Sequence, residues 1–180
     1  MKKINVWMLL CGLMLSSAVL VSCDDDDEDA NMEEDRMRIA TFMQNAAASD
    51  MFEITTGTMA QEQGETDDVQ EFGEMLVEDH TATSMEIMDM ADERDIELPT
   101  TLPAAKMTIV NRLNGETGLT FDKDFATVQV QAHQEAIALY EQADREITDA
   151  EVQAFIDATL PALRMHLQHA QQLKTMVDAM

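Results

Sequence analysis

Apolar residues recur every three or four positions through four long segments of this chain, and ionisable side chains interrupt each of these stripes. Such spacing places the apolar residues on one face of a helix, which then has to be buried. His80, His133 and His166 lie on three of the stripes, and Asp50 and Glu53 lie on the fourth. The sequence therefore predicts four helices around a core that contains polar groups. Each such group needs a partner, because an unpaired buried polar group costs on the order of a few kcal/mol.

The composition and the connecting segments also favour an all-α fold. Gly and Pro number only 6 and 3 among 180 residues, and residues with high helix propensity are common. We expect long helices over about 32–61, 67–95 and 121–144, and a fourth that follows Thr148. Short turns should make the first two and the last two helices antiparallel hairpins, and residues 96–120 should form a long crossover that contains a short helix. This is the arrangement of a ferritin-like four-helix bundle.

Sequence signals mark the expected helix ends. Asn31 with Glu34, and Thr148 with Glu151, have the spacing of a capping box, in which the first side chain accepts from the backbone at the start of a helix. Gly64 suits the end of the first long helix, since glycine accepts the left-handed conformation common there. These signals predict where the first and the last long helices begin and where the first one ends.

The first residues have the features of an export signal. Two lysines give a positive start, and the apolar run over 6–20 is short for a membrane-spanning helix. The run is followed by Val21, Ser22 and Cys23, which together with the preceding leucine resemble the lipobox of bacterial lipoproteins, where the cysteine is acylated. This predicts a signal peptide over 1–22 and a lipid anchor at Cys23. An uncleaved anchor or an ordinary secretory signal is the alternative.

An acidic run follows the cysteine, with Asp or Glu at every position from 24 to 29. Like charges repel and such a run has no apolar area to bury, so we expect residues 23–31 to form a solvated tether and 32–180 to form the bundle domain. An acidic run at this place resembles a signal for export to the outer face of the outer membrane, and a plain spacer is the alternative. We therefore expect a lipoprotein of the cell envelope, in the outer membrane, on its periplasmic face or at the cell surface.

The charge of the chain limits its partners. Lys and Arg number 11 against 36 Asp and Glu, which gives a net charge of −25. A chain this acidic repels phosphate backbones and anionic lipid head groups, and it attracts cations. Nucleic acid is therefore excluded as a partner, and membrane attachment is expected through the lipid at Cys23.

The polar residues of the stripes form a candidate metal site. Imidazole nitrogens and carboxylate oxygens are ligands for a transition metal such as zinc, iron or copper, and four helices can bring His80, His133, His166 and Glu53 together at the middle of the bundle. Asp50 is a further candidate, because its distance from the first turn matches that of His80 better. The alternative is a metal-free polar network in which each histidine bonds to a carboxylate or a carbonyl.

Two neighbours of these residues have other expected roles. His169 lies one turn after His166 and is a possible further ligand, although its position favours lining the flank of the site. Asp79 precedes His80 and points to a different side of the helix, so we expect it at the surface or behind the ligands.

Other kinds of site are disfavoured by what the sequence lacks. A ferritin-type di-iron centre needs Glu three residues before His, but those positions hold Val77, Val130 and Leu163. The sequence has no nucleophile elbow and no phosphate-binding glycine loop, which excludes serine hydrolases and nucleotide-binding proteins. Loss of Cys11 with the signal and acylation of Cys23 leave no thiolate ligand. A copper(I) site built from thioether sulfur is an alternative, but the methionines are spread over every helix as core-filling residues are.

Short sequence motifs carry a resemblance to a known family. They are Glu53-Ile54 with Gly57 and Ala60, the run Met75-Leu76-Val77-Glu78-Asp79-His80, Phe121-Asp122 with His133, and Leu160-Pro161 with His166-Leu167. Over about residues 38–176 the chain resembles the bacterial family called domain of unknown function 4142. The resemblance implies an exported ferritin-like bundle with no established reaction, and it carries over Glu53, His80, His133 and His166.

The sequence thus predicts an envelope lipoprotein whose bundle binds a transition metal in its core. The alternative is a metal-free structural, interaction or stress-related module of the envelope without catalytic activity. A redox or metal-dependent enzyme is a third interpretation, and the sequence supports it least.

Overall fold

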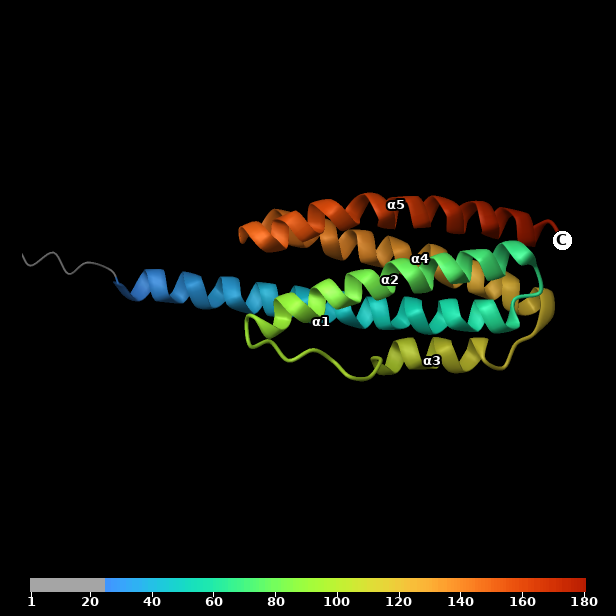
Figure 1. Ribbon diagram of the computed structural model, residues 1–180, viewed down its shortest axis with the longest axis horizontal. Coiled ribbons are helices and arrows are strands. Elements are labelled where there is room, and N and C mark those ends of the chain that lie inside the picture. The colour runs from blue at the N-terminus through green and yellow to red at the C-terminus, as the bar shows by residue number, and fades with distance from the viewer. Residues whose placement is uncertain (1–24) are drawn as a thin grey trace, which may run out of the picture.

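Five helices make up the part of the chain that the computed structural model describes, residues 25–180, and this part contains no strand. They are α1 (Asp25–Gln63), α2 (Asp67–Asp92), α3 (Ala104–Leu113), α4 (Gly118–Glu146) and α5 (Ala150–Asp178). The four long helices lie side by side along the long axis of the molecule, and α3 lies outside them, against α1 and α4 (Figure 1). The prediction of an all-α fold is confirmed.

The first helix begins earlier than expected. α1 starts at Asp25, so it includes residues 25–31 of the expected tether, and its first turns extend beyond the other helices (Figure 1). Asn31 and Glu34 lie inside α1, and the prediction that they cap it is wrong. The physical reason is that the N-terminal end of a helix favours negative charge, so an acidic run does not have to end a helix there.

The last helix begins where it was expected but has a different cap. The Asp149 side chain accepts hydrogen bonds from the backbone N–H groups of Glu151 and Val152, at 3.1 and 3.0 Å. Asp149 is therefore the N-cap residue of α5, and the predicted cap at Thr148 is wrong. Both residue types can cap a helix, so the choice depends on which backbone conformation the turn adopts.

The packing of α1 against α2 depends on two glycines. A Cβ atom on Gly73 would lie 2.6 Å from the carbonyl oxygen of Gly57 and 2.8 Å from the Cβ of Ala60. Neither contact is sterically possible, so only glycine allows the two helices to approach this closely. α1 also packs against α4, and α5 packs against α4 and α2, which places the long helices in the order α1, α2, α5, α4 around the core.

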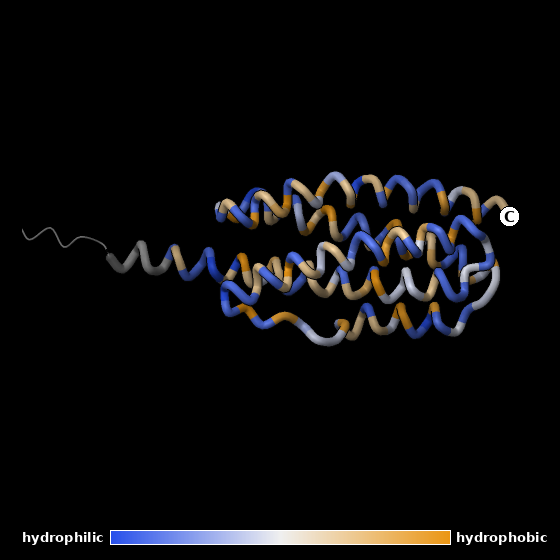
Figure 2. The backbone as a smooth tube through the Cα atoms, viewed as in Figure 1, coloured by the Kyte–Doolittle hydropathy of each residue, from blue (hydrophilic) through white to orange (hydrophobic). Residues whose placement is uncertain are grey.

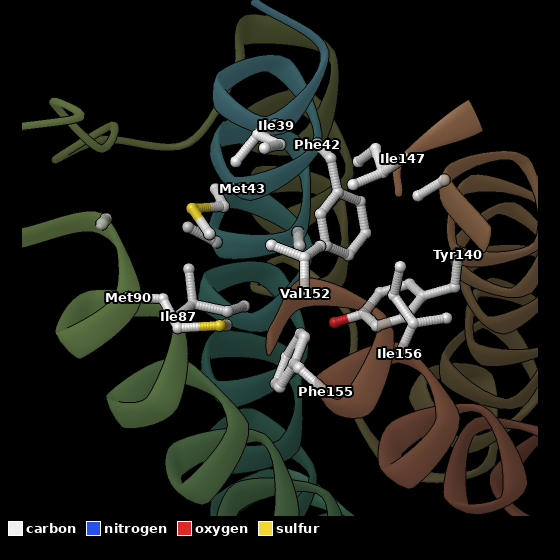
Figure 3. Close-up of a cluster of buried hydrophobic side chains, with 14 of the residues drawn as sticks. Ile39, Phe42, Met43, Ile87, Met90, Tyr140, Ile147, Val152, Phe155 and Ile156 are labelled. Atoms are coloured by element: carbon white, nitrogen blue, oxygen red, sulfur yellow. The ribbon is translucent and has the colours of Figure 1, made fainter. Parts of the chain in front are cut away.

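The core consists of two apolar clusters at different levels along the molecule. Polar and apolar residues alternate along every long helix (Figure 2), and the buried apolar ones separate into two groups. The first cluster includes residues 39–47 of α1, 87–91 of α2, 136–143 of α4 and 152–163 of α5 (Figure 3). The second cluster includes residues 52–60 of α1, 69–76 of α2, 121–132 of α4 and 170–177 of α5. The gap between them is where the polar residues of the stripes lie.

The predictions about targeting fall on another part of the chain. The signal peptide over 1–22 and the lipid anchor at Cys23 lie outside the described residues. Among the described helices, none combines the length and the apolar content needed to cross a membrane.

Candidate metal centre

A buried polar layer separates the two apolar clusters. It contains Asp50 and Glu53 of α1, His80 of α2, His133 of α4 and His166 of α5, none of which is more than 3% exposed. On each helix these residues lie where the first cluster gives way to the second. The structure therefore brings all five residues of the predicted site to one level of the core.

The three histidines lie next to one another. Their ring centroids are 5.8 Å apart for His80 and His133, 5.5 Å for His80 and His166, and 5.4 Å for His133 and His166. One ring nitrogen of each lies within 4.8 Å of one ring nitrogen of both others. Ligand nitrogens around a tetrahedral zinc ion are roughly 3.3 Å apart, given Zn–N bonds of about 2.0–2.1 Å. Small rotations of the rings would therefore bring the three nitrogens onto one ion.

Each imidazole has one nitrogen bonded to an acceptor, which fixes the position of its proton. The pairs are His80 Nδ1 with Asp50 Oδ1 at 2.8 Å, His133 Nδ1 with the Gln129 backbone oxygen at 2.9 Å, and His166 Nε2 with Asp79 Oδ2 at 2.8 Å. Because all three partners accept, the bonded nitrogen of each ring donates, and in a neutral ring the other nitrogen carries a free lone pair. Those other nitrogens are His80 Nε2, His133 Nε2 and His166 Nδ1, and none of them has a partner among residues 25–180. Metal-binding histidines are held in this way.

Asp50 acts as the partner of His80. Its Oδ1 accepts from His80, and its Oδ2 accepts from the Thr83 hydroxyl at 3.0 Å. Both oxygens thus accept hydrogen bonds from side chains of α2, and the carboxylate orients the His80 ring.

Glu53 is the unsatisfied carboxylate of the layer. In the described part of the chain neither of its side-chain oxygens has a hydrogen-bond partner, although the residue is only 1% exposed. Burial raises the pKa of Glu53 to about 7, and the charges of His80 and Lys106 and the nearby Gln129 side-chain amide oppose this shift. A cation beside the carboxylate would keep it ionised and supply the missing partner.

The histidines differ in their affinity for protons. Burial lowers the pKa of both His133 and His166 to about 4, and neighbouring histidine charge adds to the effect. Burial would also lower the pKa of His80, but the hydrogen bond that its ring donates to Asp50 and the charges of Glu53 and Asp50 outweigh this effect, so the pKa is raised. His133 and His166 are therefore neutral at pH 7, as ligands must be.

Several contacts of the site were missed or only partly anticipated from the sequence. Gln129 lies four residues before His133, and Thr83 lies three after His80, so helical spacing could have indicated both. Asp79 was expected at the surface or behind the ligands, and it reaches across to His166 while its side chain stays 44% exposed. His169 is half-buried and packs against the Phe72 ring, with centroids 4.6 Å apart. It does not belong to the group of three.

The exposed methionines lie apart from the polar layer. Met85 and Met88 of α2 are 55% and 49% exposed, and Met165 of α5 is 52% exposed. Their side chains are in solvent rather than in the core, so the buried layer gains no thioether ligand from them.

Comparison with known proteins gives the family of the chain. A family model described as "Domain of unknown function (DUF4142)" matches residues 26–173, and the chain belongs to this family. No curated relative and no solved structure matches the chain. The match includes every residue of the polar layer.

Proposed function

We propose that this DUF4142 protein binds one transition-metal ion through His80, His133 and His166, with Glu53 as the fourth ligand. Two observations carry the proposal: the three buried histidines offer ring nitrogens within 4.8 Å of one another, and one nitrogen of each ring has no partner among the described residues. Unpaired buried polar atoms are rare in folded proteins, and three of them on adjacent rings are best explained by a ligand. Asp50 serves as the partner that orients His80.

The chemistry of the ligand set indicates the class of metal. Three imidazole nitrogens and one carboxylate oxygen suit zinc, iron or copper, whereas calcium and magnesium prefer oxygen ligands alone. A divalent ion would also meet the negative charges of Glu53 and Asp50 in the same buried layer. Four protein ligands leave no position for a substrate, so binding without catalysis is the favoured activity.

The fold and location that we propose extend the sequence predictions. The short turns 64–66 and 147–149, and the segment 93–117 that contains α3, support two antiparallel hairpins joined by a crossover, as in a ferritin-like four-helix bundle.

For location we propose a lipid anchor at Cys23 in the cell envelope, in the outer membrane. The support is the lipobox-like sequence, and the test is Cys23→Ser, which should release the protein from membranes. Retention of that variant on membranes at high salt would contradict the anchor.

A metal-free function remains the second candidate. The observation that favours it is that each of the three core histidines already has one hydrogen bond, and that the pKa of His80 is raised, so the layer could hold a proton between His80 and Asp50. The protein would then be a structural or interaction module of the envelope.

Elemental analysis and thermal melting distinguish the two functions. The chain carrying Cys23→Ser, expressed in metal-replete medium, should retain about one metal ion per chain, and His133→Ala should lose it. Added zinc, copper or iron(II) should raise the melting temperature relative to chelator, since an ion that binds only the folded state stabilises it. A protein that retains no metal and melts identically in all conditions would support the metal-free network instead.

A further inference from the structure

One of the three hydrogen-bond partners of the histidines connects the buried layer with solvent. His166 is 1% exposed, but the Asp79 carboxylate that accepts from its Nε2 is 44% exposed. The partner of His80 is different, because the Asp50 side chain is only 4% exposed. His133 bonds to a backbone carbonyl inside its own helix. The pair between α2 and α5 is thus the place where a polar contact of the site reaches the surface.

The opposite side of the molecule is unfavourable for a cation. There α3 covers the seam between α1 and α4, and the Lys106 ammonium lies 4.6 Å above the Phe52 ring and 2.8 Å from Glu135 Oε2. The charge of Lys106 is close enough to lower the pKa values of Glu53 and His133. An ion that approached from this side would meet a positive charge and an aromatic ring before it reached a ligand.

A third seam is closed by backbone packing. α1 and α2 touch at Gly57 and Gly73, where there is no room even for a Cβ atom. The seam between α2 and α5 has no comparable contact between glycines, and the His166 ring is bonded there to the partly exposed Asp79 carboxylate.

We propose that metal ions enter and leave the site between α2 and α5, where the hydrogen bond between His166 and Asp79 acts as the gate. This inference rests on the proposed function. When this hydrogen bond opens, the His166 imidazole would be free to turn aside and leave a path to the other ligands, and when it forms again Asp79 would hold the ring in place. Entry and release would use the same opening.

Rates of cobalt binding test the gate. Co²⁺ is the probe because its visible absorption reports tetrahedral coordination, and binding and release to excess EDTA are followed by stopped flow at 0.5 M NaCl, where long-range attraction by surface charge is screened. Asp79→Asn weakens the gate, since an amide oxygen accepts a weaker hydrogen bond than a carboxylate. We expect association to accelerate by roughly three- to tenfold and release to accelerate by more, so that Kd weakens, because the same hydrogen bond also holds the His166 ligand. Asp79→Ala should accelerate both rates further.

Two matched variants distinguish a gate at Asp79 from a general effect of removing a negative charge near the site. Asp50→Asn changes the buried partner of His80, so release should accelerate while association stays unchanged and Kd weakens. Glu135→Gln breaks the exposed pair with Lys106 over the other seam, and neither rate should change. Circular dichroism of each metal-free variant shows whether it is folded.

The outcomes that overturn the gate are distinct. If Asp79→Asn accelerates release alone, Asp79 only positions His166. If neither rate changes, or if Glu135→Gln accelerates both, ions use another route, and the gate is refuted while metal binding stands. If the wild-type chain binds no Co²⁺, zinc, copper or iron(II), the proposed function and the gate fail together.

Discussion

The unsatisfied carboxylate of Glu53 makes a quantitative prediction about the metal-free protein. Its pKa rises from 4.5 in the unfolded chain to about 7 in the folded protein. The folded state therefore holds this proton more tightly, and stability from Glu53 is fully present below pH 4.5 and is lost as pH rises through about 7. Each pKa unit corresponds to about 1.4 kcal/mol, so the loss is about 3 kcal/mol of unfolding free energy.

The change that isolates this contribution is Glu53→Gln, which has nearly the same shape and no charge. His133 and His166 have lowered pKa values of about 4, so their contributions increase with pH over a similar window and mask the total slope. The difference between variant and wild type removes them. Measured by urea unfolding in EDTA, the variant should gain about 3 kcal/mol on wild type between pH 4.5 and pH 8.

Two controls show whether the gain in unfolding free energy comes from the buried position of Glu53. Glu74→Gln removes a charge from the exposed surface of α2 and controls for the change in net charge. A saturating metal ion should reverse the order and make wild type the more stable protein, since the ion needs the carboxylate. A difference between Glu53→Gln and wild type that is independent of pH would refute the reasoning, because it would mean that Glu53 is solvated or paired in the folded protein.

Three other predictions follow from the same contacts. Metal affinity should fall as pH drops below about 7, where protons compete at Glu53, and the raised pKa of His80 adds to this competition. The affinity should fall more steeply near pH 4, where His133 and His166 titrate, and competition titrations against a chelator of known affinity measure this. A His133→Ala variant should melt at the same temperature with and without metal, whereas wild type should not. Gly73→Ala should destabilise the protein by about 1–3 kcal/mol in urea, since its Cβ would lie 2.6 Å from a carbonyl oxygen, and Gly115→Ala, with its nearest atom at 3.4 Å, should not.

Periodicity was sufficient to predict which residues are buried. A residue on an apolar stripe has to face the core wherever the helix packs, so His80, His133 and His166 could be selected without knowledge of the neighbours. Their ring orientations depend on more than one helix. Asp79 belongs to α2 and bonds to α5, and no spacing within α2 shows which helix lies beside it. The buried histidines were therefore predictable, while the residue that joins one of them to solvent was not.

The ends of the helices were also only partly predictable from the sequence. The lengths of the two hairpin connections were predictable because Gly64 and Thr148 lie in the turns 64–66 and 147–149, and the turns themselves are short. The start of α1 was not, because an acidic run is compatible with a solvated tether and equally with the N-terminal end of a helix. Local chemistry that fits two structures cannot choose between them.

The polar layer also helps to fix how each long helix is aligned with its neighbours along the bundle axis. An apolar side chain packs almost equally well one turn higher or lower, a shift of about 5.4 Å, whereas a buried histidine does not. Moving α5 by one turn would separate His166 from Asp79 and place its ring against the apolar side chains of a cluster. The hydrogen bonds of His80 and His166, which cross between helices, thus disfavour shifted packings. Together with the bond of His133 inside α4, they leave one nitrogen of each ring without a partner among the described residues, which lowers the stability of the metal-free fold and favours a ligand that can bind all three at once.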